Sequence, residues 1–409
     1  MKENYYLDNA ATTWPKPEPV YQFMDSFFRT NGVNPGRAGH QMGVEAETMV
    51  SETRRLLAQF FGFKGSAERN VFTLNATDSL NTAIYGLVEP GDHMIITRLE
   101  HNSVLRPANH LERDCGVTVT RIDRDGQGYI DPEDIRNAIT DKTKVVVVNH
   151  GSNVLGSVQD IEAIGKIVLN SDAYFIVDSC QTAGVVPVDM DEACIDVLTY
   201  TGHKGLFGPM GIGGMIVGEG VEIKPLRVGG TGVDSISPFQ PDKYPFRLEA
   251  GTISIPGIAG LNAAQKWFAA MGREIAGEGG NELSHADASR IALAHIHEVE
   301  SAHRTKLEKV FREMDGVTVY GPNDDNRPRV STLSISIDGM PSDQVGEMLD
   351  ADFEVCVRAG LHCAPTAHLD ERTVPLKGTV RLSPGFFTDD EDIARVIEGV
   401  TELRSMAKS

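Results

Sequence analysis

Asp178, Gln181 and Lys204 have the side chains needed to bind and activate an aldehyde cofactor. Lys204 follows Thr201-Gly202-His203 and precedes a glycine-rich stretch at residues 205–214, where its amine could form an imine with an aldehyde. Asp178 follows an apolar run, and a buried carboxylate there could keep a pyridine nitrogen protonated so that the ring withdraws electrons. The spacing therefore favours pyridoxal 5'-phosphate (PLP) as cofactor, although a surface lysine beside an ordinary aspartate would give the same spacing.

A phosphate could bind where a helix is expected to begin, just after residues 71–73. The stretch Thr73-Leu74-Asn75-Ala76-Thr77 would offer free backbone N–H groups and a hydroxyl to an anion, although an ordinary helix N-cap has the same composition. Ligands of open α/β sheets bind outside the carboxyl ends of the strands. Five residues that follow expected strands should therefore converge at that edge: Thr77, His101, Asn153, Asp178 and Lys204.

Strands and helices alternate through the first two thirds of the chain. Strands are expected at residues 71–73, 93–97, 117–122, 145–149, 174–178, 197–201 and 213–217. The β-branched run Val145–Val148 is typical of a strand buried on both faces of a sheet. We therefore predict a large, doubly wound α/β domain over residues 17–255.

The pattern changes after Pro256. A long helical stretch is expected at residues 258–314, with a weak interruption at 277–280, followed by strands at 330–337 and 353–358. A last helix should begin with a capping box formed by Thr388 and Glu391. These elements predict a smaller α+β domain made of residues 256–409 together with residues 1–16.

Composition limits the kinds of partner. The chain has 409 residues, 38 basic and 58 acidic, with a formal net charge of -20, which argues against binding to nucleic acid or to anionic membranes. No apolar run is long enough to span a membrane, and the N-terminus lacks the apolar region of a signal peptide. Five scattered cysteines indicate a reduced, cytoplasmic protein.

Four histidines fall within a stretch at residues 274–303 that is rich in helix-forming residues: His285, His295, His297 and His303. A metal site is conceivable there. The four histidines do not show a recognisable ligand spacing, so a solvated helical face is favoured and no metal is predicted.

Several motifs spread over the chain resemble one family. They are Leu7-Asp8-Asn9-Ala10-Ala11-Thr12-Thr13, Asn34-Pro35-Gly36-Arg37-Ala38-Gly39-His40, Ser152-Asn153-Val154-Leu155-Gly156, Thr201-Gly202-His203-Lys204, Arg247-Leu248-Glu249-Ala250-Gly251-Thr252 and Arg358-Ala359-Gly360-Leu361-His362-Cys363-Ala364-Pro365. Together they resemble the cysteine desulfurase and selenocysteine lyase branch of the class V aminotransferases. The resemblance implies the PLP-dependent transferase fold of type I, with a large mixed-sheet domain and a smaller C-terminal α+β domain.

The resemblance also implies how PLP is bound. Lys204 would carry PLP, Asp178 would pair with its ring nitrogen, and His101 would stack on the ring and shuttle protons. Gln181 and Asn153 would lie near the phenolic oxygen of PLP and the carboxylate of the substrate. The implied phosphate ligands are Ala76, Thr77, Thr201 and His203, with Thr252 reaching in from the second subunit of a homodimer.

Substrate binding and sulfur chemistry are implied for the C-terminal part. Arg381 and Arg358 would bind the carboxylate of the substrate, a task that suits the planar guanidinium group. Cys363 would attack, as a thiolate, the sulfur of L-cysteine and keep it as a persulfide while alanine leaves. Arg358 and His362 are expected to make the surroundings of Cys363 electropositive; the alternative for Cys363 is a buried, inert thiol.

The leading hypothesis is therefore a cysteine desulfurase, with selenocysteine as a second candidate substrate and a sulfur-acceptor protein as a candidate partner. An aminotransferase, epimerase or β-lyase of the same fold is the first alternative, but transamination and epimerisation need no thiol such as Cys363. The second alternative is a sulfur-carrier or scaffold protein, which would not need the complete set of cofactor residues.

Overall fold

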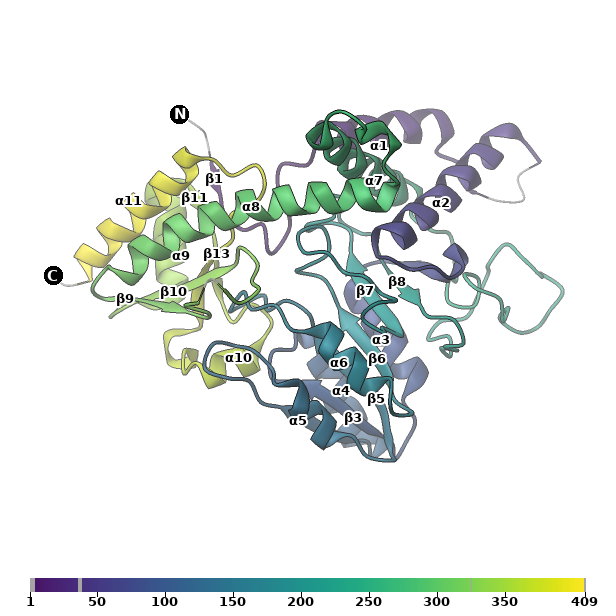
Figure 1. Ribbon diagram of the computed structural model, residues 1–409, viewed down its shortest axis with the longest axis horizontal. Helices are drawn as coiled ribbons and strands as arrows, with labels where there is room; N and C mark the ends of the chain where they lie inside the picture. Colours follow the sequence, from purple (N-terminus) through teal and green to yellow (C-terminus); the bar gives the residue numbers. More distant parts are fainter. Residues whose placement is uncertain (1–3, 36–38, 325, 408–409) are drawn as a thin grey trace.

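A seven-stranded sheet forms the centre of the larger part of the protein in the computed structural model, which describes residues 4–35, 39–324 and 326–407 (Figure 1). The strands lie in the order β2-β8-β7-β6-β5-β3-β4. Their bounds are β2 (Asn70–Thr73), β3 (His93–Thr97), β4 (Thr118–Ile122), β5 (Thr143–Asn149), β6 (Tyr174–Asp178), β7 (Val197–Thr201) and β8 (Gly213–Val217). Only β8 runs antiparallel to its two neighbours, so the predicted doubly wound mixed sheet is confirmed.

Helices cover both faces of this sheet because β5 is apolar on both sides. Val145 and Val147 pack with residues of α3 (Ala76–Leu87) and α4 (Asn102–Cys115). Val146 and Val148 belong to the other core, which is completed by α2 (Gln41–Phe60), α5 (Pro132–Ala138), α6 (Ile161–Val168) and α7 (Ile255–Ala276). Helix α1 (Glu18–Asn31) lies beside α7. The β-branched side chains of β5 therefore alternate between the two cores, and each core is covered by its own layer of helices.

The C-terminal part contains a four-stranded antiparallel sheet in the order β12-β13-β10-β9. Its strands are β9 (Val317–Tyr320), β10 (Leu333–Ile337), β12 (Arg358–Gly360) and β13 (Thr379–Leu382), and its helices are α9 (Ser342–Phe353), α10 (Pro365–Asp370) and α11 (Asp390–Met406). The predicted strand at residues 330–337 corresponds to β10. The one predicted at 353–358 contains instead the end of α9, the short strand β11 (Val355–Cys356) and the first residue of β12, and β9 and β13 were not predicted. The predicted boundaries at residues 17 and 255 stay a prediction.

The N-terminus joins this smaller part. Strand β1 (Tyr5–Tyr6) pairs in parallel with β11 (Val355–Cys356), and the backbone N–H of Ser383 donates to the carbonyl of Leu7 at 2.8 Å. Residues at opposite ends of the sequence therefore share one core, with Leu7 completely buried among the side chains of α9 and α11.

The predicted helical stretch at residues 258–314 is two helices, α7 and α8 (His285–Arg312), rather than one. Gly277 and Gly279 have φ angles of 65° and 87°, which favour glycine and end α7, and Ser284 caps the start of α8 by accepting from the N–H of Asp287. Helix α8 packs along α7 and then continues over the smaller sheet (Figure 1), so it contributes to the cores of both parts.

The predicted capping box at Thr388 is wrong by one residue. Asp389 is the N-cap of α11 and forms the capping box with Asp392, because the hydroxyl of Thr388 already accepts the N–H of Gly385. The four histidines of the 274–303 stretch are half-buried rather than on a solvated face; for example, His295 packs its ring against Phe386.

Residues 36–38, which are part of the Asn34–His40 motif, lie outside the described residues. Within the described ranges, no helix is long and apolar enough to cross a membrane. No group of three or more His, Cys, Asp and Glu side chains in those ranges is arranged to hold a metal ion.

Candidate active site

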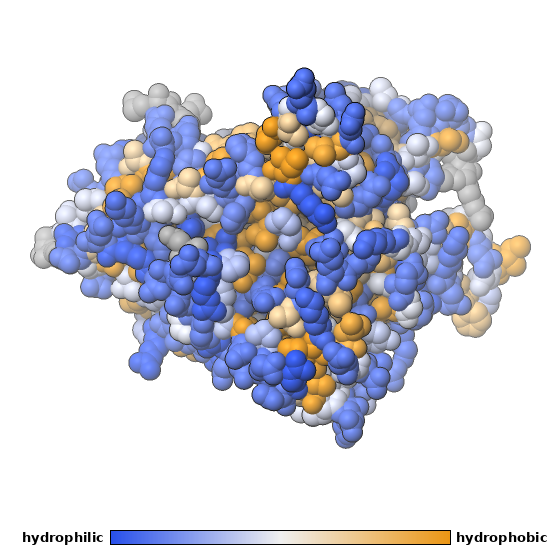
Figure 2. All heavy atoms as spheres, in the orientation of Figure 1, coloured by the Kyte–Doolittle hydropathy of each residue, from blue (hydrophilic) through white to orange (hydrophobic). Residues whose placement is uncertain are grey.

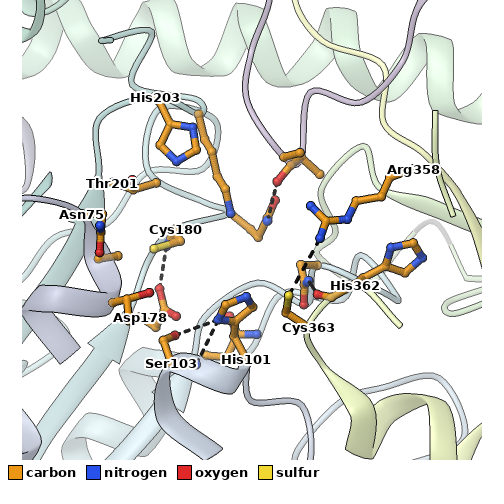
Figure 3. A pocket seen from close by; sticks show the side chains of 18 of the residues that line it. Asn75, His101, Ser103, Asp178, Cys180, Thr201, His203, Arg358, His362 and Cys363 are labelled. Carbon is orange, nitrogen blue, oxygen red and sulfur yellow. Dashed lines mark hydrogen bonds between the residues drawn. The ribbon is translucent and has the colours of Figure 1, made fainter. Parts of the chain in front are cut away.

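A cavity of about 220 Å³ lies at the carboxyl edge of the large sheet, where residues of the smaller part close it. Every predicted site residue except Thr252 lines it: Ala76, Thr77, His101, Asn153, Asp178, Gln181, Thr201, His203, Lys204, Arg358, Cys363 and Arg381. Figure 3 shows Asn75, Asp178 and Thr201 on one side of this cavity and Arg358 and Cys363 on the opposite side. We call it the main pocket.

Lys204 and Asp178 reach the main pocket from the ends of neighbouring strands, β7 and β6. In the described part of the chain, the Nζ atom of Lys204 has no hydrogen-bond or ion-pair partner, and burial lowers the pKa of its amine. Thr13 from the N-terminal segment fixes the turn by donating its hydroxyl to the carbonyl of Lys204 at 3.0 Å. Asp178 is only 3% exposed and accepts the N–H of Cys180 at 3.0 Å. An amine whose pKa is lowered by burial thus shares the main pocket with a buried carboxylate.

His101 is held in one orientation by the start of α4. Its Nδ1 atom accepts the N–H of Ser103 at 3.1 Å and lies 2.8 Å from the hydroxyl of the same residue. Because Nδ1 acts as an acceptor, the proton of the neutral ring is on Nε2. Burial lowers the pKa of His101 to about 4, so the ring is uncharged at neutral pH.

One corner of the main pocket can hold an anion. The hydroxyl of Thr201 and the Nδ1 atom of His203 are buried there and have no hydrogen-bond partner among the described residues. Ala76 and Thr77 are the first residues of α3, whose N–H groups have no acceptor within the helix. Unsatisfied buried donors at a helix start fit a phosphate group, and together with Lys204 and Asp178 this corner fits PLP.

Arg381 is buried, with 2% of its surface exposed, yet it is not fully paired. Its Nη2 atom donates to the carboxylate of Asp8 at 2.8 Å and its Nη1 atom to the carbonyl of Asn153 at 3.3 Å. The Nε atom of Arg381 and the Oδ1 atom of Asn153 have no partner among the described residues. A guanidinium group held in place with a free N–H is suited to bind a carboxylate.

Cys363 belongs to a short loop with an unusual backbone. His362 and Cys363 have φ angles of 49° and 58°, a left-handed conformation that is costly for two consecutive residues with side chains. Hydrogen bonds hold it: the side chain of Asn153 donates to the carbonyl of His362 at 2.6 Å, and the N–H of Asn102 donates to the carbonyl of Cys363 at 2.7 Å. The thiol is therefore presented from a fixed position.

The charge beside Cys363 comes from Arg358 and not from His362. The Nη2 atom of Arg358 lies 3.8 Å from the sulfur of Cys363, which is partly exposed. His362 is 3% exposed, its Nε2 atom pairs with the hydroxyl of Thr379 at 3.0 Å, and burial holds its pKa well below the usual value. The expectation that His362 adds positive charge is therefore wrong, because an imidazole buried in this way stays neutral.

Thr252 lies outside the main pocket. It is exposed and lines a separate cavity of about 850 Å³ together with residues 230–233 and the buried ion pair of Arg54 and Glu249, which are 2.7 Å apart. Its predicted contact with the phosphate of a second subunit stays a prediction.

Two residues that line the main pocket were not singled out from the sequence, Ser103 and Asn149, and three others were named only as parts of motifs, without a role: Ala10, Ala11 and Asn75. Asn75 and Ser103 could have been found from their places at the starts of the helices that carry Thr77 and His101. Ala10 gives no such signal, since it contributes its backbone carbonyl, which accepts the side-chain N–H of Gln181 at 3.0 Å.

Comparison with known proteins agrees with this geometry. The family model "Aminotransferase class-V" matches residues 5–292 and 280–396. A probable cysteine desulfurase of Methanothermobacter thermautotrophicus is 31% identical and is aligned over 99% of this chain and 96% of its own length. A cysteine desulfurase IscS of Dictyoglomus turgidum is 29% identical over 96% of this chain and 92% of its own. The apo structure of the cysteine desulfurase of Thermococcus onnurineus superimposes with a TM-score of 0.87 at 30% identity, covering 98% and 95% of the two chains.

Proposed function

Because the chain belongs to the aminotransferase class-V family, we propose that it is a PLP-dependent cysteine desulfurase, which converts L-cysteine to L-alanine and takes the sulfur onto Cys363. The observation that carries the proposal is the thiol of Cys363, which shares one pocket with Lys204 and lies 3.8 Å from the guanidinium group of Arg358. The names of the relatives support the same reaction.

Different residues of the main pocket would hold different parts of the cofactor. Lys204 would provide the amine that joins the aldehyde, and Asp178 would pair with the ring nitrogen. Thr201, His203 and the N-terminus of α3 would bind the phosphate. When bound, PLP supplies a ring that withdraws electrons from the carbon next to the substrate's amino group.

His101 and the two arginines act on the substrate. The neutral ring of His101 can give a proton from Nε2 and stack on the cofactor, since Ser103 fixes Nδ1. Arg381 and Arg358 bind the carboxylate of the amino acid, with Asn153 and Gln181 beside it. The guanidinium group of Arg358 also contacts the sulfur of Cys363, with Nη2 3.8 Å away.

Sulfur leaves the substrate by attack of the Cys363 thiolate. A new S–S bond forms as the carbon–sulfur bond of cysteine breaks, the electron pair goes to the carbon, and that carbon takes a proton to become alanine. Cys363 is left as a persulfide, which a thiol reductant or a sulfur-acceptor protein can discharge. Selenocysteine is proposed as a second substrate. The five free cysteines support a reducing, cytoplasmic setting.

The proposed function is tested by incubating the protein with L-cysteine, with and without a thiol reductant. We expect equal amounts of alanine and sulfide when reductant is present and a stoichiometric burst of alanine without it. Pyruvate as product would favour a β-lyase instead, and a keto acid formed with transfer of the amino group would favour an aminotransferase. The same assay with selenocysteine in place of L-cysteine tests whether selenocysteine is a second substrate.

Replacing Asp178 with asparagine should keep PLP bound but lower the rate of alanine formation by roughly 10²- to 10³-fold. The amide keeps the size of the side chain, while it no longer provides the charge that holds the ring nitrogen protonated. Cofactor content by absorbance and turnover by alanine release separate binding from chemistry. Exposed Asp172, replaced by asparagine, is the control; a wild-type rate in Asp178→Asn would contradict the role.

We propose that the protein is a homodimer in which Thr252 reaches the phosphate site of the other subunit. Apolar side chains of the segment 228–239, which lines one cavity with Thr252 through residues 230–233, support an interface: Val228, Ile236 and Phe239 are 71%, 97% and 80% exposed. Figure 2 shows hydrophobic atoms at the far right edge of the molecule, where the chain around these residues projects in Figure 1. Exposed apolar residues that gather in this way mark protein contacts, and two-fold dimers are the commonest oligomers.

Replacing Ile236 and Phe239 together with aspartate should convert the dimer to a monomer and lower the affinity for PLP by about tenfold or more. Two charges in an apolar interface are costly, and a monomer lacks the hydroxyl of the second Thr252. Light scattering measures the mass, and absorbance measures bound PLP. A wild-type protein that is monomeric and fully active at assay concentration would contradict the proposal.

A further inference from the structure

Two segments that are far apart in the sequence meet beside Cys363. One connects β3 with the start of α4. The other begins at Cys363 and continues through α10, and we call it the cysteine segment (residues 363–371). The two segments touch at both ends of the cysteine segment. The backbone N–H of Asn102 donates to the carbonyl of Cys363 at 2.7 Å, and the side chain of Arg98 pairs with Asp370, the last residue of α10.

The ion pairs at the far end of the cysteine segment have a defined geometry. Both Nε and Nη2 of Arg98 donate to the carboxylate of Asp370, Nε at 3.0 Å. The Nη2 atom of Arg124, which follows β4, donates to Glu371 at 2.6 Å, and its Nε atom lies 3.8 Å from Asp370. The side chain of Arg124 is 6% exposed, and those of Asp370 and Glu371 are 22% and 20% exposed. Ion pairs that are bidentate and mostly buried hold their partners in place better than pairs in open solvent.

The apolar contacts of the cysteine segment with the larger part are small. Ala364 and Ala367 are buried in the core of the large sheet, and each contributes only a methyl group. Leu369 is 60% exposed, and the ring of His368 pairs with the hydroxyl of Thr373 on the same side of the loop. Apolar contact has no preferred direction, whereas a bidentate ion pair does. The orientation of α10 on the larger part is therefore set by its ion pairs.

We propose that Arg98 and Arg124 position the thiol of Cys363 in the main pocket by holding the far end of the cysteine segment. This rests on the proposed role of Cys363 as sulfur acceptor. Cys363 reaches the main pocket from the smaller part, whereas Lys204 comes from the large sheet, so contacts between the two parts set the distance from the thiol to the substrate. A displacement of about 1 Å can slow such an attack by about 10²-fold. The two arginines lie outside the main pocket and act through Cys363.

The first test is made without cysteine, so it does not depend on the proposed reaction. The double variant Asp370→Asn, Glu371→Gln keeps the shapes of both side chains and removes their charges. Hydrogen exchange followed by mass spectrometry should become about fivefold faster or more in the cysteine segment and in the peptide that contains the N–H of Asn102, since this N–H donates to Cys363. Exchange in β6 should not change. Wild-type exchange rates in both peptides would overturn the proposal.

The second test separates substrate binding from sulfur transfer. The double variant should lower kcat for alanine formation by about tenfold or more. Its affinity for cysteine, measured by the spectral change on binding, should stay within about twofold of the wild type, because Lys204 and Arg381 are untouched. The matched control is Asp343→Asn, which removes an exposed ion pair with Lys377 inside the smaller part and should leave kcat unchanged. A wild-type kcat in the double variant, or an equal loss in the control, would overturn the proposal.

Reversing the charges tests whether the ion pair itself is needed. Arg124→Glu places a third carboxylate beside Asp370 and Glu371 and should lower kcat by about tenfold or more. Adding Glu371→Arg restores a pair of opposite charges and should recover at least about fivefold of this loss. A combined variant as slow as Arg124→Glu would overturn the proposal. If Arg124→Glu does not fold, the neutral double variant still decides. If the wild type forms no alanine, the proposed function fails, while hydrogen exchange still tests the positioning of Cys363.

Discussion

Lys204→Ala should remove the visible absorbance of bound PLP and lower alanine formation from cysteine by at least about 10³-fold. The amine of Lys204 lies in the main pocket without a hydrogen-bond or ion-pair partner among the described residues, and burial lowers its pKa. An uncharged amine is the form that joins an aldehyde. Among the residues that line the main pocket, Lys204 is the only lysine, so no neighbour can replace it.

The control for this experiment is Lys224→Ala, since Lys224 is an exposed lysine paired with Glu89 on the surface. It should keep both the absorbance and the rate. Circular dichroism checks that Lys204→Ala is folded. A Lys204→Ala protein that remains yellow and active would contradict the assignment of the cofactor to this residue.

Cys363→Ala should keep PLP and still bind cysteine, while desulfuration falls by roughly 10³-fold. Lys204, Asp178 and Arg381 are untouched by the change, so the cofactor and the carboxylate of the substrate keep their contacts. No thiolate remains to take the sulfur. A spectral change on adding cysteine measures binding, and alanine release measures the reaction. Cleavage of selenocysteine should fall less, because selenium can leave without a thiol acceptor.

Mass spectrometry tests directly whether Cys363 takes up the sulfur of cysteine. After brief exposure of the wild type to cysteine without reductant, one extra sulfur should be found on the peptide that contains Cys363. Cys356→Ala is the matched control, because Cys356 lies in β11 outside the main pocket and should leave the sulfur on Cys363. Full desulfuration by Cys363→Ala would instead favour a lyase.

The large sheet could be predicted from the sequence because burial leaves a simple pattern. Val145–Val148 must be apolar at every position, since helices cover both faces of β5. Strand β13 was missed for the opposite reason. Arg381 interrupts its apolar residues, and its burial is possible only because Asp8 and the carbonyl of Asn153 meet it from distant parts of the chain. Short-range patterns do not contain such partners.

The same distinction applies to the main pocket. Asp178, Lys204 and His101 follow strands, so a general rule about sheet edges was enough to bring them together. The neutral state of His362 could not be foreseen. It depends on burial and on a hydrogen bond with Thr379, which lies 17 residues away in the sequence.

The first residues of the chain lie at the main pocket because they contact residues from the middle and from the last quarter of the chain. Strand β1 pairs with β11, Asp8 pairs with Arg381, and Thr13 donates to the backbone of Lys204. During synthesis on a ribosome at about 5 to 20 residues per second, Arg381 is therefore added roughly 20 to 75 seconds after Asp8. The seven-stranded sheet can form during this interval, but the site cannot be completed until Arg381 has been synthesised. A nascent chain of this protein is thus a folded scaffold whose N-terminal segment is still without its partner strand.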